Sequence, residues 1–294
     1  MKSTYSTAEL ANLLGVNEST IKRWSDTGDL TCVKTKGGHR RFAVATVMEF
    51  IKKQGLSAST VSIDTLPDEN LRAHVVAGNI HKLVPELKKE MMAGNVGAIL
   101  RILRIAYVAR PKFLDICSAV VFPPLAEIGE EWHARTISVD QEHLASNALR
   151  EALSRFHAEL PRKEPNGLKA ICSCFEGELH DIVIRCVGCY LDLEGWDVLF
   201  LGQATPTMSL VDAIRTHKPS LVAISSIAQR QERSFINAIN NKIYPVAHRL
   251  RAQLALGGPG IKAQWKGKIK AEFLCDTITE IEVFANPNNY TTRN

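Results

Sequence analysis

The sequence predicts a multi-domain protein in which a basic helix-turn-helix module, a helix bundle and a doubly wound α/β domain follow one another. Basic residues concentrate in the first part of the chain, apolar residues then recur at helical spacing, and short apolar runs finally alternate with helical segments. We expect a winged helix-turn-helix over residues 1–54, a linker over 55–68, a four-helix bundle over 69–160 and a Rossmann-like doubly wound domain over 168–285.

The net charge of +5 is distributed unevenly. Residues 1–56 contain nine Lys and Arg against five Asp and Glu, whereas the remainder contains 27 against 26. A basic excess confined to one small module is typical of proteins that bind the phosphates of nucleic acids. The seven cysteines are odd in number and argue against a disulfide framework. With no hydrophobic leader and no membrane-spanning run, we expect a cytoplasmic, nucleoid-associated protein that contacts no membrane.

The first module has the signature of a helix-turn-helix. Ser6 and Glu9 have the spacing of a capping box at the start of one helix, and residues 15–17 form a turn before the next. In that second helix Ile21 and Trp24 are expected on the buried face. The side chains left pointing outward, toward the major groove, are Ser19, Thr20, Lys22 and Arg23.

A glycine-rich basic turn follows over residues 36–42. Gly37 and Gly38 allow a tight turn, and Phe42 can anchor the strand after it. The stretch resembles the wing of the MerR family, in which G-G-H-R-R-F recurs, and the resemblance implies binding to double-stranded operator DNA. A solvated basic loop is the alternative. The residues expected to face the phosphate backbone are Lys36, His39, Arg40 and Arg41.

The predicted bundle carries a cluster of aromatic, acidic and imidazole side chains. Trp132 and His133 are expected to end one helix, and a capping box beginning at Ser138 places Glu142 and His143 in the first turn of the next. The two helix ends can then converge on one spot. Taken separately, each of these residues has an ordinary interpretation as core or surface.

The last domain alternates strands and helices. We expect His180 in the loop at the carboxyl end of the first strand, where open α/β sheets bind their ligands. Glu178 is close enough to accept the other imidazole N–H. The expected strands are 168–175, 197–201, 220–226 and 253–256, and the expected helices are 181–194, 207–217 and 232–251.

Small residues at the later strand ends complete a recognisable pattern, because Thr205, Ser225, Ser226, Gly257 and Gly258 leave room for a ligand there. The layout resembles the cobalamin-binding domain of corrinoid mutases and methyltransferases, whose pattern is D-x-H-x-x-G, S-x-L and G-G. The resemblance implies cobalamin as cofactor and His180 as its lower axial cobalt ligand. Two departures are Glu178 in place of Asp, and Val183 in place of a glycine beside the cofactor's nucleotide tail.

The order of the three parts, together with W-x9-E-H, resembles CarH-type light-sensing repressors. The resemblance implies that Trp132, Glu142 and His143 shield the upper face of adenosylcobalamin. It implies that His133 takes the upper position after light breaks the cobalt–carbon bond. It further implies a dark tetramer that holds operator DNA and falls apart on illumination.

Three alternatives stay open at this point. The same fold can serve a regulator that uses haem, a bilin or a protein antagonist, and a corrinoid methyl carrier shares the bundle and sheet. Four cysteines at 172, 174, 186 and 189 suggest either a zinc site or simple packing, and their strand and helix positions favour packing. Since the sequence offers no nucleophile, carboxylate pair or phosphate loop, we expect no enzymatic activity.

Overall fold

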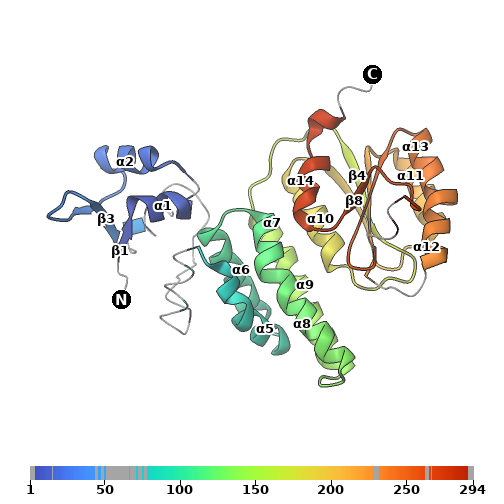
Figure 1. Ribbon diagram of the computed structural model, residues 1–294, viewed down its shortest axis with the longest axis horizontal. Coiled ribbons are helices and arrows are strands. Elements are labelled where there is room, and N and C mark those ends of the chain that lie inside the picture. Colours follow the sequence, from blue (N-terminus) through green and yellow to red (C-terminus); the bar gives the residue numbers. More distant parts are fainter. Residues whose placement is uncertain are drawn as a thin grey trace. The chain divides into compact units, whose positions relative to one another are not determined.

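The protein divides into two units, residues 1–159 and 160–294 (Figure 1). The expected linker over 55–68 lies outside the described residues except for Leu66, which is buried. The computed structural model describes residues 4–14, 16–43, 46–47, 50, 66, 71, 75, 78–227, 232–261, 265 and 267–290.

The N-terminal module is a winged helix-turn-helix built on a small antiparallel sheet. The expected capping box is confirmed: Ser6 N donates to Glu9 Oε2 at 2.8 Å, and Glu9 N donates to Ser6 Oγ at 3.3 Å. The sheet has the order β1-β3-β2, and its strand β1 was not predicted from sequence. The elements are β1 (Thr4–Ser6), α1 (Thr7–Leu14), α2 (Glu18–Asp26), β2 (Val33–Lys34) and β3 (Arg40–Ala43).

The wing is the β2–β3 hairpin, and its turn needs a glycine. Gly38 has φ +77°, a conformation that residues with a Cβ rarely adopt, and its N–H donates to Thr35 O at 2.8 Å. Ile21 of α2 and Phe42 of β3 are both fully buried. Trp24 is only half-buried, with its ring 4.9 Å from that of Phe50.

The bundle follows in the same unit. Its helices are α5 (Val84–Met92), α6 (Val96–Ala109), α7 (Phe113–Ile116), α8 (Phe122–His133) and α9 (Val139–Glu159), with the 3-10 turn η2 (Ile80–Leu83) before them. A π turn, η3 (Cys117–Val121), joins α7 to α8 directly before Pro123 and Pro124, which lack the N–H groups of a regular helix. None of the described helices combines the length and apolar character needed to span a bilayer.

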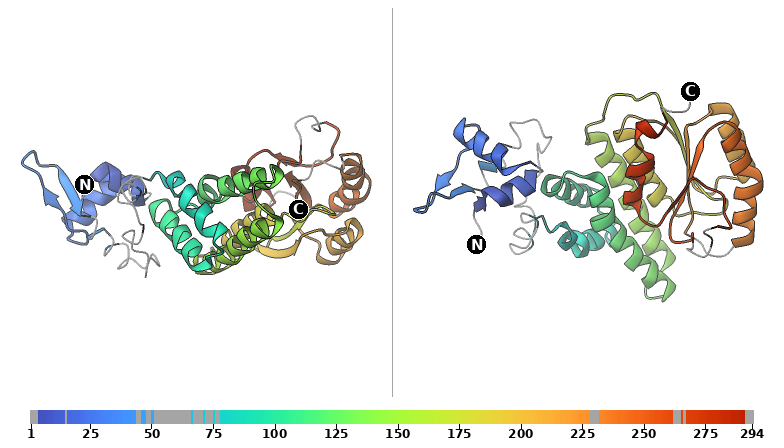
Figure 2. Two further views of the ribbon diagram at one scale, coloured as in Figure 1. Left: turned by 90° about the horizontal axis from the view of Figure 1, so that it is seen from below. Right: turned by 45° about the horizontal axis from the view of Figure 1, so that its top comes forward.

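The second unit is a doubly wound parallel sheet, as the sequence predicts, and its strand order is β5-β4-β6-β7-β8. Helices α10 and α14 cover one face, and α11, α12 and α13 cover the other (Figure 2). The strands are β4 (Lys169–Cys174), β5 (Asp197–Gly202), β6 (Leu221–Ser225), β7 (Gln253–Gly257) and β8 (Phe273–Cys275). The helical segments are α10 (Ile182–Leu193), α11 (Thr207–His217), α12 (Glu232–Ala238), η4 (Ile239–Ile243), α13 (Tyr244–Arg249), η6 (Ile278–Glu280), α14 (Ile281–Phe284) and η7 (Pro287–Asn289).

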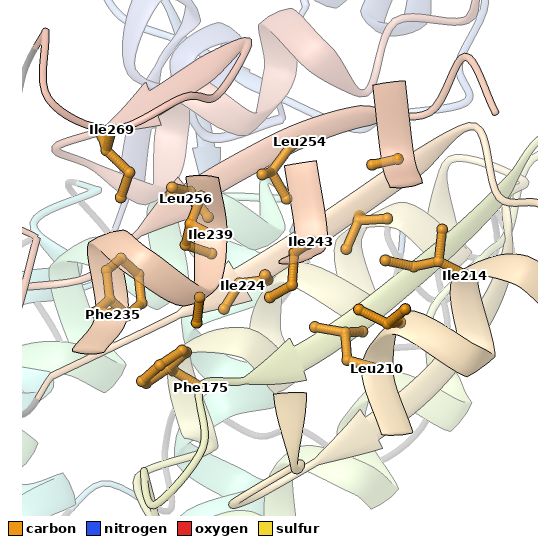
Figure 3. Packing of buried hydrophobic residues seen from close by; sticks show 14 of the residues in the cluster. Phe175, Leu210, Ile214, Ile224, Phe235, Ile239, Ile243, Leu254, Leu256 and Ile269 are labelled. Carbon is orange, nitrogen blue, oxygen red and sulfur yellow. The ribbon is translucent and has the colours of Figure 1, made fainter. Parts of the chain in front are cut away.

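The helix expected over 232–251 is wrong as a single α-helix. It contains the π turn η4 just before Pro245, again where a proline removes one backbone donor. Phe235, Ile239 and Ile243 from this segment pack on Leu254 and Leu256 of β7 in the main core of the unit (Figure 3).

The strand order places the first loop of the sheet at a switch point. From β4 the chain moves to β5 on one side and later to β6 on the other, so the connections leave in opposite directions. Open α/β sheets bind ligands where two neighbouring connections part in this way. The loop between β4 and α10, which contains His180, lies at this position.

Gly195, in the turn after α10, provides a stability test. It has φ +85°, and a Cβ there would overlap the carbonyl oxygen of Glu164. We expect Gly195→Ala to lower the free energy of unfolding by about 2 kcal/mol or more. Urea denaturation of the full chain measures this change.

The matched control is Gly129→Ala in α8, where an added Cβ meets no atom within 4 Å. Helix propensity predicts that this variant gains up to about 1 kcal/mol. Equal effects of the two substitutions would contradict the assigned backbone conformation at Gly195.

Candidate cofactor site and nucleic-acid interface

The loop between β4 and α10 is fixed by hydrogen bonds to its neighbours and presents His180. Phe175 N donates to the carbonyl oxygen of Ser225 at 3.0 Å, which ties the start of the loop to β6. Gln203 Nε2 donates to Leu179 O at 2.6 Å, which ties its end to the loop after β5. The His180 side chain is 59% exposed. A rigid loop therefore holds an accessible imidazole at the carboxyl edge of the sheet.

Glu178 is the buried group that orients this imidazole. Its side chain is 2% exposed, and its Oε1 accepts from His180 N at 2.9 Å and lies 2.6 Å from His180 Nδ1. The contact expected between the two residues is thus present. Its Oε2 accepts from Ile227 N at 2.7 Å, a partner that sequence reasoning missed. The carboxylate joins the loop after β4 to the residue that follows β6.

Cys174 and Ser225 lie below the loop. Burial raises the pKa of Cys174 to about 12, so its thiol stays protonated and can donate. The Cys174 sulfur lies 3.6 Å from His180 O and 3.6 Å from Ser225 Oγ. The hydroxyl of Ser225 thus takes part in supporting the loop, and contact of this residue with a ligand stays a prediction.

The remaining small residues at the sheet edge are also engaged in local packing. Gly258 has φ +107°, and a Cβ there would lie 2.6 Å from Ser226 O, so the close approach of two backbone segments requires glycine. Ser226 N donates to Gly257 O at 3.1 Å, and Thr205 Oγ1 donates to Gly202 O at 3.3 Å. These contacts shape the edge of the sheet, and ligand contacts by these residues stay a prediction.

Glu176 caps α11, an interaction that sequence reasoning also missed. Its Oε2 accepts from Thr207 Oγ1 at 2.8 Å and from Thr207 N at 3.2 Å. These hydrogen bonds lower the pKa of Glu176, with a smaller contribution from the charge of Lys242. The two partners are 31 residues apart in sequence, so no local motif signals the cap.

The bundle residues occur in two pairs at neighbouring helix ends. Trp132 and His133 end α8, with ring centroids 4.8 Å apart. Glu142 and His143 lie in the first turns of α9, with Glu142 Oε2 3.6 Å from His143 Nε2. Helices α8 and α9 pack on one another, and Ser138 N donates to the Gln141 side chain at 2.9 Å, which is one of the two hydrogen bonds of the expected capping box.

This end of the bundle also exposes apolar surface. Trp132 is 39% exposed, Val139 51% and Leu144 48%. Large apolar side chains gathered at one end of a bundle often mark a binding surface. This end of the bundle therefore exposes imidazole, carboxylate and indole side chains beside apolar ones.

The expected DNA-binding residues lie on α2 and on the wing, and they differ in exposure. Ser19, Lys22 and Arg23 on α2 are exposed, and Lys36 and His39 are exposed on the wing turn; Thr20 and Arg41 are half-buried. Arg40 departs from the expectation that it faces phosphate. Its guanidinium pairs with Asp26 at 2.6 Å and only 19% of its side chain is exposed.

The cysteines agree with the packing interpretation. Cys172, Cys174 and Cys186 are buried, and desolvation raises the pKa of the Cys172 thiol and that of Cys189, the latter to about 12. Thiolates, the form that binds zinc, are disfavoured in such surroundings. Within the part of the chain that the structure describes, no group of three or more His, Cys, Asp or Glu is positioned to hold a metal ion.

Family models match three regions of the chain. A helix-turn-helix domain matches residues 4–55, and two B12 binding domain models match residues 83–156 and 168–282. The first region is the winged module, the second lies in the bundle and the third contains the sheet.

The chain is similar to two curated proteins of Myxococcus xanthus, the HTH-type transcriptional repressors CarA and CarH, at 26% and 29% identity. Each comparison covers 87% of this chain and 87% of the relative. Among solved structures it is similar to the monomethylamine corrinoid protein of Methanosarcina barkeri, with 20% identity and a TM-score of 0.57, over 68% of this chain and 95% of that chain. That likeness concerns the fold. Together, the comparisons confirm the expected resemblance to CarH-type repressors and the expected fold class.

The cap on α11 predicts a pH dependence. Because its folded pKa is depressed, ionised Glu176 contributes stability above its ordinary pKa, and this contribution is lost as pH falls through the folded value. We expect Thr207→Val to raise the Glu176 pKa toward the ordinary range and to flatten the acid limb of the stability profile. Carboxyl-resolved NMR titration measures the shift.

Thr207→Ser is the matched control, since it keeps the hydroxyl that donates to Glu176. Its Glu176 pKa is expected to stay at the wild-type value. An identical titration of Glu176 in the Val and Ser variants would rule out the hydroxyl as the cause.

Proposed function

We propose, from the resemblance to CarH-type repressors over most of the chain, that this protein is a cobalamin-binding transcription regulator. It acts as a repressor that binds double-stranded operator DNA through its winged module. The observation that carries the proposal is the exposed imidazole of His180, held by a buried carboxylate at the switch point of a doubly wound sheet.

The residues present suit a cobalt-centred cofactor. Imidazole nitrogen is a good ligand for cobalt, and a carboxylate on the other ring nitrogen fixes the tautomer and orientation. Glu178 contacts His180 Nδ1, so Nε2 is the nitrogen that would bind cobalt from below. The His180 main chain is held as well, through its N–H to Glu178 and its carbonyl oxygen to Cys174. The ligand is therefore preorganised before the cofactor arrives.

In this proposal the bundle would hold the organic ligand of the cofactor. Trp132, Glu142 and His143 would contact it, and the exposed apolar side chains beside them would add contact area. When bound, adenosylcobalamin supplies a cobalt–carbon bond that light can break. His133, next to Trp132, would hold the cobalt once that bond is broken, and such a rearrangement would change the packing of the bundle, the oligomeric state and the affinity for DNA.

Val183 favours a second candidate. It is half-buried in the first turn of α10, where the cobalamin-binding pattern has glycine. A branched side chain there narrows the slot for a nucleotide tail. A planar tetrapyrrole without such a tail, such as haem or a bilin, would avoid this restriction and could serve the same regulator.

Replacing His180 tests the lower ligand. We expect His180→Ala to weaken binding of adenosylcobalamin about 100-fold or more, because the metal–nitrogen bond is lost. An absorbance titration in the dark measures this affinity. The control is His217→Ala, an exposed imidazole at the end of α11, which is expected to bind as the wild type does. A wild-type protein that stays colourless, or unchanged affinity in His180→Ala, would refute the proposal.

Illumination tests the switch. Wild-type protein loaded with adenosylcobalamin in the dark is expected to form a tetramer that binds operator DNA. After illumination, the tetramer is expected to dissociate and to release the DNA. Light scattering and duplex binding before and after illumination measure the two changes. Binding of haem or bilin in place of cobalamin would support the second candidate, and methyl transfer without DNA binding would indicate a corrinoid carrier.

A further inference from the structure

The wing of the DNA-binding module is joined to the second helix by one ion pair. Arg40 on β3 and Asp26, the last residue of α2, approach to 2.6 Å between guanidinium nitrogen and carboxylate oxygen. The Arg40 side chain is 19% exposed and that of Asp26 is 63% exposed. The arginine is therefore the inner partner, and the acid reaches inward from the surface to meet it.

Strand geometry explains why Arg40 points inward. Successive side chains on a strand face opposite sides, so Arg40 shares a face of β3 with Phe42, and Arg41 lies on the other. Phe42 is fully buried, as is its cross-strand neighbour Tyr5 at 2% exposure. That face is the one that packs on the helices of the module. Arg40 and Arg41 consequently lie on opposite faces of β3 and do not form a single phosphate-binding cluster.

The position of Asp26 is unfavourable on two general grounds. A carboxylate in the last turn of a helix opposes the helix dipole, which favours cations there. An acidic side chain on the second helix also lowers the positive potential that attracts nucleic acid. In addition, Arg40 Nε is buried without a hydrogen-bond partner among the described residues. These unfavourable terms occur at a contact that links the helix to the wing. This indicates that the link between α2 and β3 has a role of its own.

We propose that the Asp26–Arg40 ion pair is a positioning lock that sets the angle of the wing relative to α2. In this role Arg40 is a positioning residue that acts through the wing, and contacts with phosphate belong to the exposed side chains such as Lys36. The inference rests on the proposed DNA-binding function and adds to it the group that orients the two DNA-facing elements.

The test compares two acids on the same helix. Glu18, 51% exposed and 3.7 Å from Lys22, is an acidic side chain on α2 that is not part of the lock. Removal of either negative charge raises the positive potential, so electrostatics alone predicts that Glu18→Gln and Asp26→Asn both strengthen DNA binding. The lock predicts opposite signs. Glu18→Gln strengthens binding, whereas Asp26→Asn weakens it by about fivefold, the factor expected for loss of one ion pair.

The measurement uses the full chain, kept in the dark, and a fluorescein-labelled duplex that the wild-type protein has selected from a random-sequence library. Affinity is recorded over a range of salt concentrations, because the slope of log K against log salt counts phosphate contacts. Asp26→Asn and Arg40→Gln are expected to weaken binding with the wild-type slope, while Lys36→Ala lowers the slope by about one. The double variant Asp26→Arg, Arg40→Asp is expected to recover most of the lost affinity.

Two results would overturn the lock. One is stronger binding by Asp26→Asn together with a reduced slope in Arg40→Gln, which would make Arg40 a phosphate contact. The other is a loss of DNA affinity that disappears when binding is measured well below the melting temperature of each variant, as determined by circular dichroism. The ion pair would then contribute only to the stability of the fold. If the wild-type protein selects no duplex, the proposed DNA-binding function fails and the lock falls with it. Wild-type binding with a strengthened Asp26→Asn variant refutes the lock alone.

Discussion

The candidate cofactor site depends on one buried carboxylate. Glu178 is almost completely withdrawn from solvent, and a charge in such a position is stable only when hydrogen bonds replace water. Two backbone amides and an imidazole nitrogen do so here. Because one amide belongs to Ile227 beyond β6, the carboxylate fixes two loops that are separated by 49 residues in sequence. The orientation of His180 is thus a property of the whole sheet edge.

The elements predicted from sequence are those whose pattern is local and strong. The apolar runs of β4, β5, β6 and β7 and the helices α10 and α11 were placed within one or two residues, since buried parallel strands read as continuous apolar segments. Strand β8 and helix α14 were missed. They have three and four residues, and they are stabilised by contacts such as that of Phe273 with Phe284, whose rings are 5.2 Å apart.

Site residues show the same division. The Glu178–His180 contact joins residues two apart and could be predicted, whereas the cap of Glu176 on Thr207 and the pair of Arg40 with Asp26 join residues that only the fold brings together. Small residues were harder to interpret. Gly258 was expected to make room for a ligand, but the structure shows that its own backbone neighbours already require a glycine. A pattern of small residues does not by itself distinguish these two needs.

The π turn η4 has a consequence for how this segment meets the sheet. In a regular α-helix, side chains four residues apart drift by about 40° around the axis, so a long series with that spacing spirals off one face. Phe235, Ile239, Ile243 and Ala247 have this spacing, yet all are buried. The wider turn between them unwinds the drift. Apolar side chains spaced four residues apart, which would turn away from the sheet on an ideal α-helix, therefore stay in one straight row facing the strands.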